Sequence, residues 1–145
     1  MKVKVKKLSD KAIIPTFGSN GSAGGDLYAV IDEQVQIAPG QTVLIGTGLC
    51  FEIPDGYVGL VYARSGLATK SGLAPANKVG VIDSDYRGEV KVALYNHSSE
   101  VRFISSGERI AQMVIAPYLK VEYEEVDDLS DTARGSGGFG STGSK

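Results

Sequence analysis

Two carboxylates stand two residues apart in NKVGVIDSDYRGEV, the stretch that covers residues 77–90. Asp83 follows the apolar Val81 and Ile82, so we expect it to emerge from an apolar wall, where a carboxylate needs a partner or a catalytic role. In a strand, residues two apart face the same side, so Asp83 and Asp85 could both meet one ligand. The alternative is a hairpin turn, because Asp-x-Asp with a nearby glycine is ordinary turn chemistry.

A second set of residues has donors that suit phosphate oxygens. The stretch ARSGLA combines the guanidinium of Arg64, the hydroxyl of Ser65 and the N–H of Gly66, although an Arg-Ser-Gly turn is often only structural. Gln112 alternates with apolar neighbours and could point at solvent or at a ligand. Asp26 follows three small residues and suits either an outer-shell ligand of Mg²⁺ or a turn cap.

The glycine-rich stretch RGSGGFGSTG, residues 134–143, stands near the end of the chain. Composition alone predicts a flexible linker. However, glycines let successive N–H groups surround an anion, Ser141 and Thr142 add hydroxyls, and Arg134 adds a planar fork. The spacing is not a true phosphate-binding loop, because Ser141 replaces the lysine and no strand precedes it. With Phe139 to stack on a base, the stretch predicts a lid that closes over a nucleotide.

The composition argues against several classes of protein. The net charge of −2 gives no general attraction to nucleic acid or an anionic membrane, and no apolar run approaches the roughly 20 residues of a membrane span. The single cysteine, Cys50, cannot form an intrachain disulfide, and without a cysteine–histidine cluster we expect no structural zinc. The single histidine, His97, is expected in a solvated turn. No targeting segment is seen, so we expect a cytoplasmic protein, with a nuclear or viral origin left open.

Strands must position these groups, because the dominant period of the sequence is two. Val3 and Val5 alternate with lysines as in a charged edge strand, and residues 65–72 could hold a short helix. The pattern predicts an all-β domain over residues 1–130 followed by a flexible tail over 131–145. The expected strands cover residues 34–37, 42–45, 49–53, 57–62, 89–95 and 109–116.

Taken together and in order, five stretches resemble the motifs of the trimeric dUTPase family, the dUTP diphosphatases. Gly25 stands where the family often has an aromatic residue, and Ala63 stands where it often has proline. The five stretches are AGGDLYA (23–29), RSGLA (64–68), GVIDSDYRGEV (80–90), GERIAQ (107–112) and RGSGGFGSTG (134–143).

The resemblance implies a jelly-roll-like distorted β-barrel and a homotrimer whose three active sites are shared between subunits. It implies hydrolysis of dUTP to dUMP and pyrophosphate, which keeps uracil out of DNA and supplies dUMP for thymidylate synthesis. Asp83 would be the general base that directs water at the α-phosphorus. Mg²⁺ would be chelated mainly by the triphosphate, with Asp26 touching it through water.

The resemblance also assigns substrate contacts. Asn77 and the backbone of residues 80–82 would select uracil, Tyr86 would leave no room for a 2′-hydroxyl, Phe139 would cover the base and Arg134 would meet the γ-phosphate. The full set of substrate-binding residues is Arg64, Ser65, Gly66, Asn77, Gly80, Val81, Ile82, Tyr86, Lys91, Gln112, Arg134, Phe139, Gly140, Ser141 and Thr142.

Two alternatives remain open. A dCTP deaminase of the same fold would carry a glutamate base three residues before an asparagine, but here Ala93 precedes Asn96. A non-catalytic nucleotide-binding β module would have no use for Asp83, since a carboxylate beside a triphosphate repels it.

Overall fold

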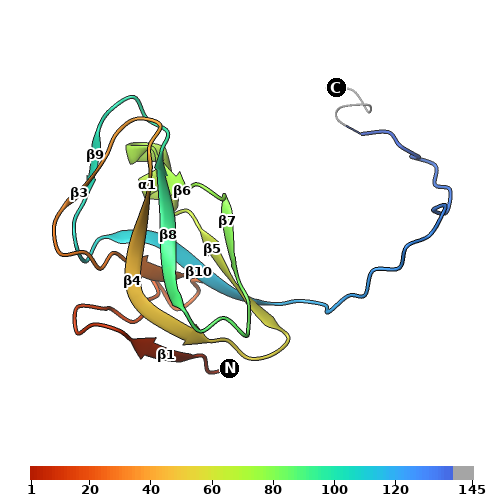
Figure 1. Ribbon diagram of the computed structural model, residues 1–145, viewed down its shortest axis with the longest axis horizontal. Helices are drawn as coiled ribbons and strands as arrows, with labels where there is room; N and C mark the ends of the chain where they lie inside the picture. Colours follow the sequence, from red (N-terminus) through yellow and green to blue (C-terminus); the bar gives the residue numbers. More distant parts are fainter. Residues whose placement is uncertain (139–145) are drawn as a thin grey trace.

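Ten strands and one short helix follow one another in the computed structural model, which describes residues 1–138 (Figure 1). All six predicted strands form, and the lysine-rich segment forms the edge strand that its pattern predicts. The elements are β1 Lys4–Lys7, β2 Gly25–Tyr28, β3 Val35–Ile37, β4 Thr42–Glu52, β5 Tyr57–Tyr62, α1 Ser65–Ser71, β6 Leu73–Pro75, β7 Val79–Ile82, β8 Glu89–Asn96, β9 Arg102–Ile104 and β10 Arg109–Pro117.

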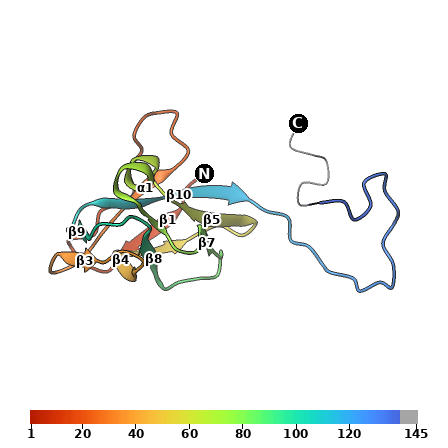
Figure 2. The ribbon, with the colours of Figure 1, turned by 90° about the horizontal axis from the view of Figure 1, so that it is seen from above.

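The strands form two four-stranded sheets, ordered β1-β4-β8-β6 and β2-β10-β5-β7, and a small β3-β9 pair. Figure 2 shows β10 and β5 in one layer and β4 and β8 in the other. The core lies between the two layers, where Leu49 of β4 and Leu94 of β8 meet Leu27 of β2 and Ile110 of β10. The all-β, jelly-roll-like prediction is confirmed, but the two sheets do not close into one barrel within the described residues.

Two predicted strands, 42–45 and 49–53, belong to one long strand, β4. The expected break between them is a shift of register between Gly46 and Cys50, not a turn. Gly48 adopts a φ of 64° there and donates its N–H to Glu89 Oε1 at 2.8 Å, while Thr47 Oγ1 donates to the carbonyl of Val90 at 2.6 Å. Side chains from β8 and β4 therefore replace the missing ladder bonds, and the strand continues.

The edge strand β1 is held to β4 partly by charge. Lys4 pairs with Glu52 in the strand register, and its Nζ lies 2.7 Å from Glu52 Oε1. The hydrogen bond from Lys4, with its positive charge, lowers the pKa of the Glu52 carboxyl. The pair is exposed, so its contribution to folding is small.

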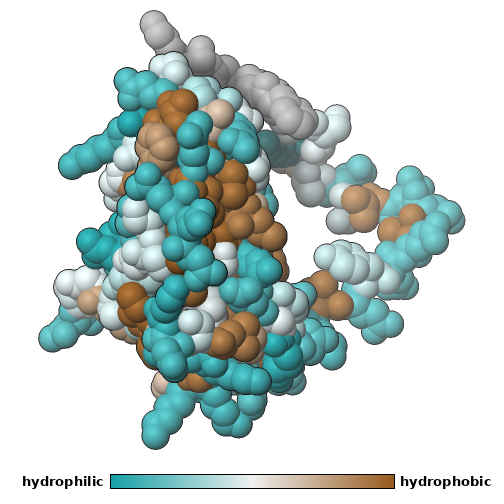
Figure 3. Space-filling model, turned by 60° about the vertical axis from the view of Figure 1, so that its left-hand side comes forward, coloured by the Kyte–Doolittle hydropathy of each residue, from teal (hydrophilic) through white to brown (hydrophobic). Residues whose placement is uncertain are grey.

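The second sheet has apolar residues on both of its faces. On β5, Val61 faces the core, while Leu60 lies on the opposite face in a row with Val114 and Val81. Val81 is 62% exposed and Val79 is 36% exposed. An antiparallel sheet with one solvated face would instead alternate apolar and polar residues. The apolar surface visible in Figure 3 also forms a band among polar side chains.

After β10 the described chain leads away from the sheets, without helix or strand, as Figure 1 shows. Its side chains are exposed, Leu119 at 87% and Tyr123 at 93%. The division into a domain over 1–130 and a lid over 131–145 stays a prediction, and Phe139, Gly140, Ser141 and Thr142 lie outside the described residues. In residues 1–138, no helix has the length and apolar character needed to cross a membrane.

Candidate active site

Three side chains from neighbouring strands form a polar row on the second sheet. Gln112 of β10 pairs with Asp26 of β2 on one side and with Tyr62 of β5 on the other. Residues directly opposite each other on adjacent strands share a face. Because Leu27 and Val61, the next residues along, are buried in the core, the row faces away from it.

This row forms the floor of a cavity of about 420 Å³, which we call the arginine cavity. Arg64, Ser65 and Gly66 enter it where the chain passes from β5 into α1, so three predicted phosphate donors come together with Asp26 and Gln112. Arg64 has an extended backbone, with φ −88° and ψ 127°, and its carbonyl accepts the first helical hydrogen bond from Ala68. A Cβ added to Gly66 would meet nothing within 4 Å, so its backbone is open to an approaching group.

Asp26 is held between two guanidinium groups. Arg64 Nε lies 2.7 Å from its Oδ1 and Arg109 Nη1 lies 3.2 Å from its Oδ2, and the residue is only 7% exposed. Such charge-assisted bonds compensate for the burial of a carboxylate. The residues described include no group of three His, Cys, Asp or Glu side chains that could hold a metal ion. Asp26 therefore offers at most its remaining lone pairs to a hydrated ion, and its metal role stays a prediction.

Gln112 is fixed rather than free in solvent. Its Nε2 donates to the carbonyl of Ala63 at 2.9 Å, directly before Arg64. Its Oε1 lies so close to Gly24 that a Cβ there would be 2.5 Å from it. The amide is thus clamped between the two segments that carry Asp26 and Arg64.

Arg109 was not recognised as a site residue from the sequence. A shift of register between Arg109 and Ala111 marks a β-bulge. Residues three apart in a regular strand face opposite sides, and the bulge brings Arg109 to the same side as Gln112. Its neighbour Glu108 is directed elsewhere, because Glu108 Oε1 accepts the N–H of Ser105 at 3.1 Å. The sequence around Arg109 contains no pattern that predicts this bulge.

The second group of predicted residues surrounds β7. The strand reading of Asp83 and Asp85 is wrong: β7 ends at Ile82, and the N–H of Tyr86 donates to the carbonyl of Asp83 at 3.2 Å in a turn. We call residues 83–88 the aspartate loop. Asp83 does not emerge from an apolar wall in the single chain, because it is exposed there.

The aspartate loop borders a second cavity of about 410 Å³, lined by Leu44, Ile82, Tyr86 and Lys91 among others. Tyr86 Oη donates to the carbonyl of Glu89 at 3.0 Å, and Lys91 Nζ lies 3.4 Å from Glu89 Oε2. Two of the predicted substrate contacts, Tyr86 and Lys91, therefore share this cavity with Ile82.

The remaining predicted contacts lie on or just before β7. Asn77 is exposed in the preceding turn, Gly80 is buried and Val81 is exposed. Lys78 has a φ of 65°, which is uncommon for a residue with a side chain.

The two groups of residues lie far apart in one chain. Ile82 pairs with Gly59 near the start of β5, so Asp83 is level with Val58, whereas Arg64 follows the other end of β5. Six residues of extended chain correspond to about 20 Å. No described residue lines both cavities.

Arg134 lies in the exposed segment after β10, where its Nε donates to the carbonyl of Gly137 at 2.7 Å. The structure places it in neither cavity.

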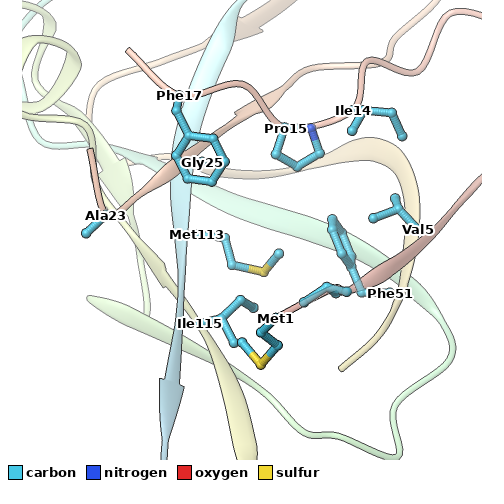
Figure 4. Close-up of a pocket in the computed structure, with 11 residues that line it drawn as sticks. Met1, Val5, Ile14, Pro15, Phe17, Ala23, Gly25, Phe51, Met113 and Ile115 are labelled. Atoms are coloured by element: carbon cyan, nitrogen blue, oxygen red, sulfur yellow. The ribbon is translucent and has the colours of Figure 1, made fainter. Parts of the chain in front are cut away.

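A third cavity, of about 350 Å³, lies on the other face of the second sheet (Figure 4). Its lining is apolar, with Met113 and Ile115 of β10 near Phe51 and the ring of Phe17 over Gly25. A Cβ at Gly25 would lie 3.0 Å from Pro15 Cβ, which explains why this chain has no larger residue there. No charged side chain is among its described lining, so this cavity is less suited to a phosphate than the arginine cavity.

Comparisons with known proteins cover almost the whole chain. A family model described as dUTPase matches residues 10–143. The deoxyuridine 5'-triphosphate nucleotidohydrolase of Nautilia profundicola is 55% identical over 143 residues, with 99% of each chain covered. The structure of Staphylococcus bacteriophage 80alpha dUTPase with dUPNHPP has a TM-score of 0.85 and 30% identity, with 98% of each chain covered. A mutant dUTPase from phage phi11 of S. aureus, described with a structural Mg(II) ion, has a TM-score of 0.79 and 27% identity, covering 88% of this chain and 98% of that chain. Both the arginine cavity and the aspartate loop fall inside the matched residues.

Proposed function

The chain belongs to the dUTPase family, and from this premise we propose that it hydrolyses dUTP to dUMP and pyrophosphate. The observation that carries the proposal is the arginine cavity, which gathers Arg64, Ser65, Gly66 and Gln112 around one opening. Guanidinium, hydroxyl and N–H donors fixed in advance suit an anionic phosphate chain. Relatives over 99% of the chain carry the name of this activity.

Asp83 acts as the general base. Its carboxylate accepts a proton from a water molecule as that water attacks the α-phosphorus, and pyrophosphate leaves. Arg64, Ser65 and Gly66 hold the phosphate chain, while the clamped amide of Gln112 lies near the α-phosphate. Catalysis then rests on alignment and charge neutralisation, as is general for phosphoryl chemistry.

The site is completed by more than one chain. A separation of about 20 Å along β5 prevents Asp83 and Arg64 of one chain from serving the same α-phosphate. The apolar row of Leu60, Val81 and Val114 gives a second copy a surface to cover. We therefore propose a homotrimer in which one subunit supplies the arginine cavity, a second the aspartate loop and a third the C-terminal tail.

Uracil is selected by the backbone of β7. This strand is the last in its sheet, so one side of Gly80, Val81 and Ile82 has no strand partner among the described residues and can pair with a base. Cytosine presents an amine where uracil presents an acceptor, so buried groups would be left unpaired. Asn77 adds its amide, Tyr86 excludes a 2′-hydroxyl, and Lys91 contributes a further contact.

The reaction uses Mg²⁺, which would neutralise charge on the triphosphate when bound. The triphosphate would hold most of the ion's charge, since the described lining of the arginine cavity supplies a single carboxylate, Asp26, whose two oxygens already accept hydrogen bonds. Asp26 would touch the ion through its hydration shell.

Residues 131–145 form a lid, with Phe139 over the base, Arg134 at the γ-phosphate, and Gly140, Ser141 and Thr142 around the phosphates. Deletion of residues 134–145 is expected to lower turnover steeply while the folded trimer persists, because the described part of this segment adds nothing to the core. Turnover and sedimentation velocity measured together test this. Full activity in the truncated protein would exclude the lid.

The residues at two positions of β8 disfavour deamination. Ala93 of β8 stands where a deaminase of this fold would need its glutamate base, and it pairs with Leu44. Asn96 is fully buried and donates to the carbonyls of Ile37 and Glu100, so it is committed to the fold.

Pyrophosphate release from dUTP, dTTP, dCTP and UTP in the presence of Mg²⁺ tests the proposed function. We expect release from dUTP alone, without ammonia. Ammonia from dCTP would indicate a deaminase, and binding of dUTP without any release would indicate a non-catalytic module.

A further inference from the structure

Arg109 lines the arginine cavity, and the proposed function gives it no role. Half of its side chain is exposed, and its Nη1 lies 3.2 Å from Asp26 Oδ2. Arg64 occupies the other oxygen of the same carboxylate and also places its Nη1 3.5 Å from the carbonyl of Arg109. The two arginines and the aspartate are therefore one connected unit.

The charges of this unit decide what the cavity can attract. Asp26, Arg64 and Arg109 are the charged side chains among its described lining, so two guanidiniums and one carboxylate leave one positive charge in excess. Without Arg109, the carboxylate of Asp26 would neutralise Arg64, and the cavity would carry no net charge. The chain as a whole has a net charge of −2, so the attraction for an anion must be local.

The geometry also makes Arg109 a support for Arg64. Asp26 engages Arg64 through Nε alone, which leaves the Nη atoms of Arg64 directed elsewhere. A carboxylate tied at only one oxygen can rotate, whereas a second guanidinium on Oδ2 fixes its plane. The β-bulge between Arg109 and Ala111 is what turns Arg109 towards this carboxylate.

We propose that Arg109 is a positioning residue for the phosphate chain: it shares the Asp26 carboxylate with Arg64, holds both groups in place and leaves the cavity positively charged. This inference rests on the proposed function for its substrate. It concerns binding of the phosphate chain more than the chemical step.

The test compares Arg109→Gln, which removes the charge, with Arg109→Lys, which keeps it. Calorimetric titration with inorganic pyrophosphate is expected to show binding about ten- to a hundredfold weaker in Arg109→Gln, with partial recovery in Arg109→Lys. The KM for dUTP should rise by a similar factor, with a smaller change in kcat. Arg102→Gln, which removes an arginine paired with Glu100 on β9, is the matched control and should bind pyrophosphate like the parent.

A double-mutant cycle with Asp26→Asn separates positioning from a simple charge effect. If Arg109 acts through Asp26, the Arg109→Gln effect should shrink in the Asp26→Asn background, whereas independent effects would add. Parent-like pyrophosphate binding in Arg109→Gln would overturn the inference. Equal losses of pyrophosphate affinity in Arg109→Gln and Arg109→Lys, with equal drops in melting temperature, would also overturn it. A parent protein that releases no pyrophosphate from dUTP would instead refute the proposed function, and the pyrophosphate titration would still report on Arg109.

Discussion

In the arginine cavity every charged side chain has a partner from the same chain, whereas the carboxylates of the aspartate loop stand in solvent. Asp26 is 7% exposed between two guanidiniums, and Gln112 is tied to Ala63. Asp83 and Asp85 are exposed and belong to no ion pair among residues 1–138. One half of the proposed site is thus organised by folding of the single chain, whereas the other half would become organised on association into the proposed trimer.

This difference matters for catalysis because preorganised donors need no rearrangement when charge develops. Binding of phosphate can be built into the fold of one chain. The proton transfer that we propose for Asp83 would need a low-dielectric, water-poor setting, which a solvent-exposed turn does not provide alone. Variants in the two regions should therefore differ in how strongly they depend on the oligomer.

The largest effect is expected from Asp83→Asn. It should lower turnover by about 10²- to 10⁴-fold, the usual contribution of a general base, while dUTP binding persists. Asp85→Asn, two residues away on the same loop, is the control and should change turnover little. Calorimetric titration with dUTP and a pyrophosphate-release assay measure binding and turnover of both variants. Normal turnover in Asp83→Asn would show that Asp83 is not the general base.

Mixing two inactive chains tests whether the two regions come from different subunits. Asp83→Asn and Arg64→Ala proteins, unfolded and refolded together, should recover activity that neither has alone. In a closed cyclic trimer each mixed assembly would hold one complete site, so an equal mixture should regain about a quarter of the parent activity. No recovery, with mixed trimers shown by native mass spectrometry, would mean that both groups act within one chain.

A smaller effect is expected when the clamp on Gln112 is disturbed. The methyl group of Gly24→Ala would lie 2.5 Å from Gln112 Oε1, so the amide must move and its bond to Ala63 is lost. A displacement of this size should lower kcat about ten- to a hundredfold. Gly21→Ala, in the same loop with nothing within 4 Å, should keep the parent kcat. Equal kinetics for the two variants would show that the position of Gln112 does not matter.

The smallest effect is expected in the aspartate loop, where Tyr86→Phe removes one exposed hydrogen bond to the carbonyl of Glu89. Denaturation at a fixed protein concentration should show a free energy of unfolding lower by about 0.5–1.5 kcal/mol, at the lower end of that range. The KM for dUTP should stay nearly constant, because the ring that would pack under the sugar remains. A large rise in KM would mean that the hydroxyl itself contacts the substrate.

The alternation of apolar residues was enough to predict the strands that build the core, such as β5 and β8. It did not single out the short strands β2, β6, β7 and β9, although it predicted β1 and β3, which are equally short. In β2 the residues Gly25 and Asp26 also disfavour a strand by propensity, and tertiary pairing with β10 overrides that preference.

The candidate site was predictable in its residue types more than in its geometry. Arg64, Ser65, Gly66, Gln112 and Asp26 do gather in one cavity. The position of Asp83 in a turn depends on where β7 stops pairing with β5, and the place of Arg109 depends on a bulge. Both positions depend on the pairing of strands that are distant in sequence. A pattern of a few consecutive residues therefore does not predict them.

The bulge beside Arg109 also ties the length of this strand to the direction of its side chains. Ile110 is the residue between Arg109 and Ala111, so its deletion would give a regular ladder with β2 that keeps Arg109 on the side of Gln112 but removes a fully buried core side chain. A regular ladder of unchanged length would instead pair Ile110 with Tyr28 and turn Arg109 towards the core, although no residue had changed.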